Sequence, residues 1–230
     1  MIWAFGSLLL LFNNMIKVGI LNFGFGNLKS ITNAFEFIKQ EYSIITNPSK
    51  EHQLDECTHL LLPGVGSFAY GVSELQKFKL KDYFLAQVNN GKPILGICLG
   101  MQLLFESSTE DGLNPGLSFC KGECECFTTD KNFNGTLPHV GYSQIHIDNK
   151  SDSLWSNINE SSPFYFVHTY RVSTKEICSY QNYAIARHGN SKFIAYVRAD
   201  NIIGVQFHPE KSQLAGLQFL KNFCRLPIKE

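Results

Sequence analysis

The sequence predicts an α/β protein built as a single three-layer domain with a mostly parallel central sheet. Short apolar runs alternate with amphipathic stretches through the first half of the chain, which is typical of repeated strand and helix units. The apolar runs are nearly continuous, as in parallel strands that are buried on both faces. With 230 residues, 44% of them hydrophobic, the chain is long enough for one full core.

The first half of the chain supplies the predicted parallel strands. Apolar side chains recur at helical spacing from Leu28 to Ile38 and predict the first helix there. Pro63 stops one strand, and Asn90 with Gly91 marks the turn before another. The predicted strands cover residues 17–23, 42–46, 58–63 and 93–97, with helical material before Asn90 and a helix over 100–108.

The second half is richer in strands and closes with one helix. Its apolar runs are short and are bounded by polar or turn-forming residues. The predicted strands cover residues 117–127, 142–147, 163–169, 182–187, 192–197 and 201–207, and the helix covers 212–224. No internal repeat or low-complexity linker interrupts the pattern, so residues 15–230 are predicted to form one domain.

Residues 1–14 are interpreted as an N-terminal extension. Their apolar run has no basic segment before it and no small-residue cleavage site after it, unlike a secretory signal peptide. The run is also far shorter than the roughly 20 apolar residues that cross a bilayer. The domain pattern starts with the strand that follows Met15.

The charges and the cysteines limit the classes of protein to which this chain can belong. Twenty Lys and Arg residues balance twenty Asp and Glu residues, so no net positive field favours nucleic acid or an anionic membrane. Seven cysteines without paired spacing indicate a reducing compartment, and we expect a cytoplasmic protein. Cys120, Cys124 and Cys126 lack a fourth metal ligand nearby, so alternation along a strand is the simpler interpretation, and no metal or cofactor is expected.

Cys98 is the candidate nucleophile. The segment "GICLG", residues 96–100, has the spacing of a nucleophile elbow, in which a strand turns sharply into a helix and presents one reactive side chain. The flanking glycines lack the Cβ atoms that would collide in such a turn. The helix N-terminus favours a thiolate. An isolated cysteine is more often simply buried, and this alternative stays open at this point.

His208 is the candidate base. It follows an apolar strand in "GVQFHPEKS", and Glu210 lies two residues further on. In extended backbone, positions two apart project to the same side, so the carboxylate can orient the imidazole. Cys98, His208 and Glu210 then fit the logic of a catalytic triad. The alternative is a structural histidine at the end of a strand, whose hydrogen bonding is satisfied by its neighbour Glu210.

The segment "PGVG", residues 63–66, is a candidate oxyanion site. Gly64 and Gly66 flank Val65, so the peptide at Val65 can turn its N–H toward a bound oxygen. Leu99, directly after the nucleophile, supplies a second N–H. Taken alone, the segment also fits an ordinary turn at the end of a strand.

Together, "PGVG", "GICLGMQLLFE" and "GVQFHPEKS" resemble the class I, or triad, glutamine amidotransferases. Within this family the chain is most similar to the branch of glutaminase subunits that belong to imidazole glycerol phosphate synthases. The segments "NFGFGNLKSI", "LPHVGY" and "FYFVHTY" support the branch, although its members often have tryptophan where this chain has Tyr142. The resemblance covers residues 15–230.

The resemblance implies glutamine hydrolysis by a triad of Cys98, His208 and Glu210. Val65 and Leu99 would supply the N–H groups of the oxyanion hole. The roles in binding the α-groups of glutamine would fall to Gln102 and Glu110, assisted by main-chain groups of Thr169 and Tyr170. For Glu110, a solvated loop carboxylate is the alternative.

The resemblance also implies a partner, a separate (β/α)8-barrel cyclase that uses the ammonia to form imidazole glycerol phosphate in histidine biosynthesis. The pattern "FGFGNLKS", residues 23–30, lacks the third glycine of a dinucleotide loop and is assigned to the partner-facing surface. Three alternatives remain: a glutaminase serving a sugar-modifying amidotransferase in surface-polysaccharide synthesis, a cysteine hydrolase of a related fold, and a binding module without activity.

Overall fold

The computed structural model describes residues 16–22, 27–46, 55–180 and 182–228. The N-terminal extension and residues 23–26 of the predicted partner-facing segment lie outside the described residues. Those two interpretations therefore stay predictions.

The centre of the fold is an eight-stranded sheet in the order β2-β1-β3-β4-β14-β13-β12-β9. The strands from β2 to β14 run parallel to one another, and the last three pairings are antiparallel. The predicted mostly parallel sheet is therefore confirmed. The strands are β1 (Lys17–Leu21), β2 (Glu41–Ile45), β3 (His59–Leu62), β4 (Ile94–Ile97), β9 (Ile145–Ile147), β12 (Asn182–His188), β13 (Ser191–Ala199) and β14 (Ile202–Val205).

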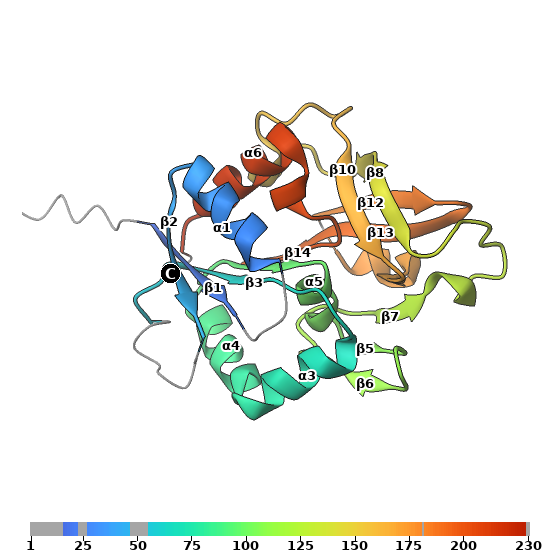
Figure 1. Cartoon of the computed structure of the whole chain (residues 1–230), viewed down its shortest axis with the longest axis horizontal. Helices are drawn as coiled ribbons and strands as arrows, with labels where there is room; N and C mark the ends of the chain where they lie inside the picture. Colours follow the sequence, from blue (N-terminus) through green and yellow to red (C-terminus); the bar gives the residue numbers. More distant parts are fainter. Residues whose placement is uncertain (1–15, 23–26, 47–54, 181, 229–230) are drawn as a thin grey trace, which may run out of the picture.

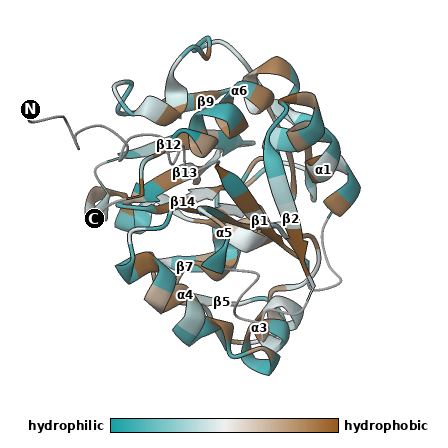
Figure 2. Cartoon of the chain, turned by 90° about the vertical axis from the view of Figure 1, so that its left-hand side faces the viewer, coloured by the Kyte–Doolittle hydropathy of each residue, from teal (hydrophilic) through white to brown (hydrophobic). Residues whose placement is uncertain are grey.

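Helices lie on both faces of this sheet, as the three-layer prediction requires (Figure 1). One face is covered by α1 (Leu28–Phe37) and α6 (Gln213–Cys224). The other is covered by α3 (Phe68–Lys77), α4 (Leu80–Asn89) and the short α5 (Leu99–Leu103). Figure 2 turns the molecule and shows the strands between the two helical layers.

The continuous apolar runs follow from this double burial. In β3, Leu61 joins the buried cluster that contains Phe35 and Phe219, on the side of α1 and α6. Its neighbours Leu60 and Leu62 join the cluster that contains Phe68 and Phe84, on the side of α3 and α4. Because successive strand residues point to opposite faces and both faces are covered, Leu60, Leu61 and Leu62 are all apolar.

Two smaller sheets lie beyond the parallel half. One pairs β8 (His139–Ser143) with β10 (Phe164–His168), and the other has the order β11-β7-β5-β6. Short 3₁₀ turns complete the connections. The remaining elements are β5 (Ser107–Ser108), β6 (Asn114–Pro115), β7 (Glu123–Cys126), β11 (Tyr170–Val172), η1 (Phe127–Thr129), η2 (Ser153–Trp155), η3 (Thr174–Ser179) and η4 (Pro209–Lys211).

Two boundary predictions around residue 110 are wrong. The helix predicted over 100–108 ends at Leu103, and the strand predicted over 117–127 is limited to Glu123–Cys126. The cause is a set of main-chain bonds between the two segments. The amides of Leu117 to Cys120 donate to carbonyls of Leu103, Leu104 and Phe105, which would otherwise accept from the next helical turn.

The strand predicted over 142–147 is also wrong as a single element. Its residues divide between β8, which pairs with β10, and β9, which pairs with β12 in the main sheet. The division falls at the exposed Gln144, which belongs to neither strand. The apolar positions change phase there, from Val140 and Tyr142 to Ile145 and Ile147, and this shift is the sequence signal of the change of sheet.

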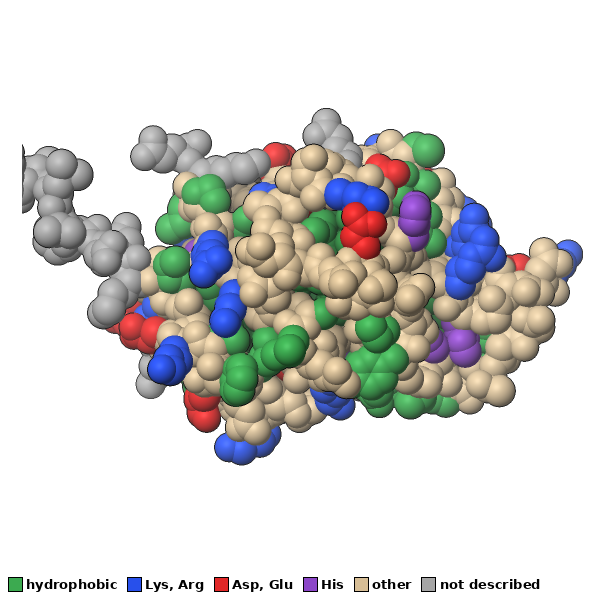
Figure 3. All heavy atoms as spheres, turned by 90° about the horizontal axis from the view of Figure 1, so that it is seen from above, with side chains coloured by type: hydrophobic (Ala, Val, Ile, Leu, Met, Phe, Trp, Pro, Cys, Tyr) green, Lys and Arg blue, Asp and Glu red, His purple; other side chains and the backbone are tan. Residues whose placement is uncertain are grey.

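The surface carries no dominant charge on the face formed by α1 and α6. Figure 3 shows that face, with basic and acidic side chains interspersed among polar and apolar ones. The balance agrees with the equal numbers of basic and acidic residues. Within the described ranges, no helix is both long enough and apolar enough to span a membrane.

The two phenylalanines of α1 give a matched test of the core. We expect Phe35→Ala to lower the free energy of unfolding by about 3–5 kcal/mol, because the Phe35 ring is fully buried and its loss leaves a cavity. Phe37, 68% exposed on the same helix, should change it by no more than about 0.5 kcal/mol when replaced by alanine. Urea denaturation followed by circular dichroism measures both. Equal losses of unfolding free energy in the two variants would contradict the packing of α1 against the core through its Phe35 side.

Candidate active site

Three neighbouring parallel strands end at the same edge of the sheet and carry the three predicted site segments. In the register, Leu62 of β3 pairs with Gly96 of β4, and Ile97 of β4 pairs with Val205 of β14. The main-chain N–H of Cys98 then donates to the Val205 carbonyl over 2.7 Å. The structure therefore brings residues 63–66, Cys98 and His208 together, because carboxyl ends of adjacent parallel strands meet at one edge.

Cys98 sits in a sharp turn between β4 and α5. Its φ of 53° and ψ of −109° lie in a region that L-residues rarely occupy, as in a nucleophile elbow. A Cβ on Gly100 would lie 1.9 Å from the Leu62 carbonyl oxygen, and one on Gly96 would lie 2.6 Å from the Gly100 oxygen. The turn therefore requires glycine at both positions, as the spacing of the sequence indicates.

The loop that follows β3 packs directly onto this turn. A Cβ on Gly64 would lie 2.7 Å from the Cβ of Leu99, so Gly64 permits the close approach of the two segments. Gly66 has a φ of +127° with nothing within 4 Å of an added Cβ, so its requirement is conformational. Val65 is 39% exposed and lines the cavity beside Cys98. The loop thus lies where an oxyanion site is expected.

His208 and Glu210 form a buried pair at the end of β14. The Nδ1 atom of His208 lies 2.8 Å from Oε1 of Glu210, and the two side chains are 2% and 1% exposed. The main-chain N–H of His208 donates to the Tyr165 carbonyl over 2.8 Å. A carboxylate only accepts, so Nδ1 carries the proton of this bond. Within the described part of the chain, Nε2 has no hydrogen-bond partner and is available for proton transfer.

The electrostatics of the pair favour a charged imidazole. Burial alone lowers the pKa of His208, but the negative charge that Cys98 can carry, together with the hydrogen bond to Glu210, raises it to about 10. A thiolate and an imidazolium are the charge states that a triad uses.

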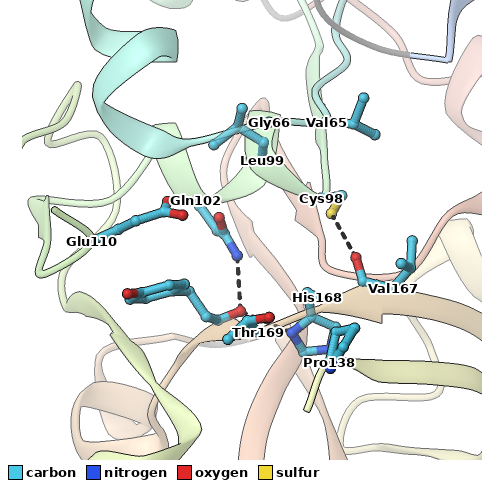
Figure 4. A pocket seen from close by; sticks show the side chains of 11 residues that line it. Val65, Gly66, Cys98, Leu99, Gln102, Glu110, Pro138, Val167, His168 and Thr169 are labelled. Carbon is cyan, nitrogen blue, oxygen red and sulfur yellow. Dashed lines mark hydrogen bonds between the residues drawn. The ribbon is translucent and has the colours of Figure 1, made fainter.

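A cavity of about 300 Å³ opens beside Cys98 (Figure 4). In that view Cys98 and Glu110 lie on opposite sides of the space, with Gln102 between them. It is lined by Val65, Gly66, Cys98, Leu99, Gln102, Glu110, Pro138, Val167, His168, Thr169 and Tyr170. All four residues predicted to contact the substrate are in this lining.

Gln102 and Glu110 present acceptor oxygens to the cavity. The Nε2 atom of Gln102 donates to the Tyr170 carbonyl over 3.0 Å and to Oε1 of Gln206 over 3.1 Å, which leaves its amide oxygen for a ligand. Oε2 of Glu110 accepts from the main-chain N–H of Phe68 over 2.7 Å. Burial raises the pKa of Glu110, whereas the bond from Phe68 lowers it. Acceptor oxygens of this kind suit an ammonium group.

Sequence reasoning did not single out four residues that shape the site: Pro138, Val167, His168 and Gln206. The Val167 carbonyl lies 3.8 Å from Sγ of Cys98, and Nε2 of Gln206 lies 3.6 Å from it. Pro138 precedes β8, and Val167 and His168 belong to β10. No local sequence pattern indicates that these segments line the cavity. Gln206 had a signal, since it lies two positions before His208 and projects to the same side.

The cysteine cluster has no metal-binding arrangement. Cys124 and Cys126 lie in β7, whereas Cys120 precedes the strand. Burial raises the pKa of Cys120 to about 12, which favours an inert thiol. All seven cysteines are free, and among the residues that the structure describes no group of three His, Cys, Asp or Glu side chains could hold a metal ion.

Comparison with known proteins gives matches along most of the chain. The family described as glutamine amidotransferase class-I matches residues 19–226. A Campylobacter jejuni protein named imidazole glycerol phosphate synthase subunit HisH 1 is 42% identical over 214 residues, 91% of this chain and 100% of the relative. A Gloeobacter violaceus protein named imidazole glycerol phosphate synthase subunit HisH is 38% identical, over 90% of this chain and 88% of the relative.

Solved structures share the fold at lower identity. The structure of PurLQS from Thermotoga maritima superimposes with a TM-score of 0.66 at 17% identity, and the match covers 91% of this chain and 97% of that one. At this level of identity the likeness shows the α/β fold.

The buried pair predicts a pH-dependent stability. The folded-state pKa of His208, about 10, lies above its usual value of 6.5, so the stabilisation is complete below about pH 6.5 and is lost as the pH rises toward 10. We expect Glu210→Gln to lower the free energy of unfolding by about 1–3 kcal/mol near pH 6. The difference should shrink near pH 10, as urea denaturation at several pH values would measure.

Glu160 provides the matched control. It pairs with Lys150 on the surface, where both side chains are at least 60% exposed. Glu160→Gln should change stability little at any of these pH values. A loss in Glu210→Gln that grows with pH would contradict the charged pair.

Proposed function

The chain belongs to the class I glutamine amidotransferases, and from this premise we propose that it is the glutaminase subunit of an imidazole glycerol phosphate synthase in histidine biosynthesis. It hydrolyses glutamine to glutamate and passes the ammonia to a partner subunit, in the cytoplasm. The observation that carries the proposal is the meeting of Cys98, His208 and Glu210 at one edge of the sheet, beside a cavity of about 300 Å³. The similarity to relatives named as subunits of this synthase supports the pathway.

In the first step, Sγ of Cys98 attacks the side-chain amide carbon of glutamine and forms a carbon–sulfur bond. The carbonyl oxygen takes the negative charge and accepts from the N–H groups of Val65 and Leu99. His208 gives the proton on Nε2 to the leaving nitrogen, and the carbon–nitrogen bond breaks to release ammonia. A glutamyl thioester remains on Cys98.

In the second step, water hydrolyses the thioester. His208, now neutral at Nε2, takes a proton from the water, and the hydroxide attacks the thioester carbon. The carbon–sulfur bond breaks, glutamate leaves, and Cys98 returns as a thiolate beside the imidazolium. Glu210 holds the ring by its bond to Nδ1 in both steps, so Nε2 faces the reaction throughout.

The lining of the cavity supports one direction for bound glutamine. The acceptor oxygens of Gln102 and Glu110 would bind the α-ammonium group, and main-chain groups of Thr169 and Tyr170 would assist at the α-carboxylate. In Figure 4 Glu110 lies on the far side of the cavity from Cys98. Glutamine bound in this way extends its amide toward the sulfur, which is the orientation that the attack needs.

We assign the partner to the exposed apolar residues Val65, Leu137, Val140 and Tyr142, of which Val65 lines the cavity and Leu137 precedes the lining residue Pro138. Their exposed fractions run from 37% to 56%. An apolar surface at the exit of a site that produces ammonia suits a partner that receives it before it reaches solvent. By family resemblance the partner is a (β/α)8-barrel cyclase.

The pathway is tested with purified chains and Cys98→Ala. We expect this variant to bind the cyclase, to form no imidazole glycerol phosphate from glutamine, and to support its formation from ammonium salt, because only the nucleophile is missing. Product formation and co-purification measure both parts. The loss of glutamine-dependent turnover should be at least about 10³-fold.

Two results would overturn parts of this assignment. Normal glutamine hydrolysis by Cys98→Ala with the cyclase present would exclude the mechanism. Failure of the wild type to bind the cyclase, together with productive binding to a sugar-modifying amidotransferase, would move the chain to that pathway. Turnover of peptides or esters without any partner would favour the cysteine-hydrolase alternative.

A second test concerns activation by the partner. We propose that the peptide at Val65 turns when the partner binds and so brings its N–H to the oxyanion. Gly66, at a φ of +127°, permits this turn, and alanine would be strained there. Gly66→Ala should therefore lower partner-stimulated kcat by about 10²-fold or more and change KM much less, since the donor acts on the transition state.

Steady-state glutaminase kinetics with and without the cyclase measure this effect. Gly122→Ala is a matched control, because Gly122 has a φ of +117° but is not part of the cavity lining. It should lose stability without losing stimulation. Equal turnover of wild type and Gly66→Ala, in the presence and absence of the cyclase, would show that this loop does not control the chemistry.

A further inference from the structure

We propose that the side-chain amide of Gln206 stabilises the Cys98 thiolate by donating a hydrogen bond to it, and that Gln102 sets the orientation of that amide. The inference deepens the proposed glutaminase function, since it rests on Cys98 being the nucleophile. It assigns a role to a fully buried polar side chain that the triad mechanism does not use.

The backbone places Gln206 beside the nucleophile. Gln206 directly follows β14, and Cys98 directly follows β4, at the point where Val205 pairs with Ile97. The bond from Cys98 N–H to the Val205 carbonyl joins the two segments. As a result, Nε2 of Gln206 lies 3.6 Å from Sγ of Cys98, within hydrogen-bonding distance for sulfur.

The neighbours of Gln206 decide which end of its amide faces the sulfur. The Tyr170 carbonyl can only accept, so it requires the NH₂ end of Gln102, at 3.0 Å. The second hydrogen of that NH₂ group then points to Gln206, whose oxygen accepts it at 3.1 Å. Gln206 must therefore present its own NH₂ group to Cys98. A flipped amide would oppose two NH₂ groups and set an oxygen against the sulfur.

Two of the groups around the sulfur prefer different charge states of Cys98. The Val167 carbonyl, at 3.8 Å, can only accept and so suits the protonated thiol. The Gln206 N–H can only donate and gains strength when the sulfur is negative. Both partners are built into the fold, so deprotonation of Cys98 exchanges one contact for the other without movement of the backbone.

Gln102 connects this arrangement to the substrate. Its oxygen lines the cavity where glutamine binds, and its NH₂ group fixes Gln206. One amide thus contacts the substrate on one side and orients the donor to the nucleophile on the other. The thiolate is therefore most stabilised when Gln102 is held in the orientation that also accepts a substrate ammonium group.

The test measures the reactivity of Cys98 without glutamine and without a partner. Iodoacetamide labels the wild type, Gln206→Glu and Gln206→Met over a range of pH, and peptide mass spectrometry follows each cysteine. We expect Cys98 alkylation near pH 7 to fall at least about tenfold in Gln206→Glu, which places an oxygen against the sulfur. The pH of half-maximal alkylation should rise. Gln206→Met, which lacks the donor but adds no charge, should shift both in the same direction by less.

The controls separate this effect from misfolding. Cys178 is exposed and serves as an internal reference whose rate should not change, while the buried Cys57 should stay unlabelled. Gln87→Glu places a carboxylate at another buried glutamine, on α4 and outside the cavity lining, and should leave Cys98 alkylation unchanged. Labelling of Cys57 in Gln206→Glu would show that this variant is unfolded. The alkylation rate of Cys98 in Gln206→Met would then be the test of the inference.

An unchanged rate and pH profile of Cys98 in Gln206→Met would overturn the inference. The same holds if Gln87→Glu slows Cys98 as much as Gln206→Glu does. Because alkylation needs neither glutamine nor cyclase, a wrong pathway assignment leaves this result standing. Normal glutaminase turnover in the Gln206 variants with unchanged alkylation would contradict this inference alone.

Discussion

The main-chain hydrogen bond from Cys98 to Val205 fixes the register on which the remaining site geometry depends. It sets the nucleophile segment beside the strand that carries Gln206 and His208, while β3 on the other side of β4 brings residues 63–66 to the same edge. A slip of one residue would turn the side chains of β14 to the opposite face. His208 would then lose both Cys98 and the Tyr165 carbonyl. The apolar residues on both faces of these strands hold that register.

The same edge is also where the backbone is most crowded and strained. Gly64, Gly96 and Gly100 let the oxyanion loop, β4 and α5 approach within distances that any Cβ would prevent. Cys98 itself adopts a positive φ without being glycine. Strain of this kind persists only where surrounding packing over-determines it. Here the two buried clusters above and below the sheet provide that packing, which links the size of the core to the shape of the site.

Much of this arrangement is predictable from the sequence, and the misses have physical causes. The strands, the elbow and the pairing of His208 with Glu210 follow from local spacing, because period and glycine placement are local properties. The early end of α5 and the short β7 were missed because amides of residues 117–120 compete for the carbonyls at the end of the helix. Val167 and His168 were missed because they reach the cavity through the β8–β10 pair, a tertiary contact that residues 163–169 do not encode alone.

The β8–β10 pair is a single layer of two antiparallel strands, and residues along β8 alternate between its two sides. His139 contacts His168, which lines the cavity, whereas Val140 and Tyr142 are exposed. Tyr142 is further tied by its hydroxyl to the Lys211 carbonyl. Inner positions are constrained by the cavity, whereas the outer position Val140 has no such constraint and Tyr142 is held by its own hydrogen bond. Substitutions at outward positions such as Val140 can therefore change the surface of this ribbon without altering the cavity lining on its inner side.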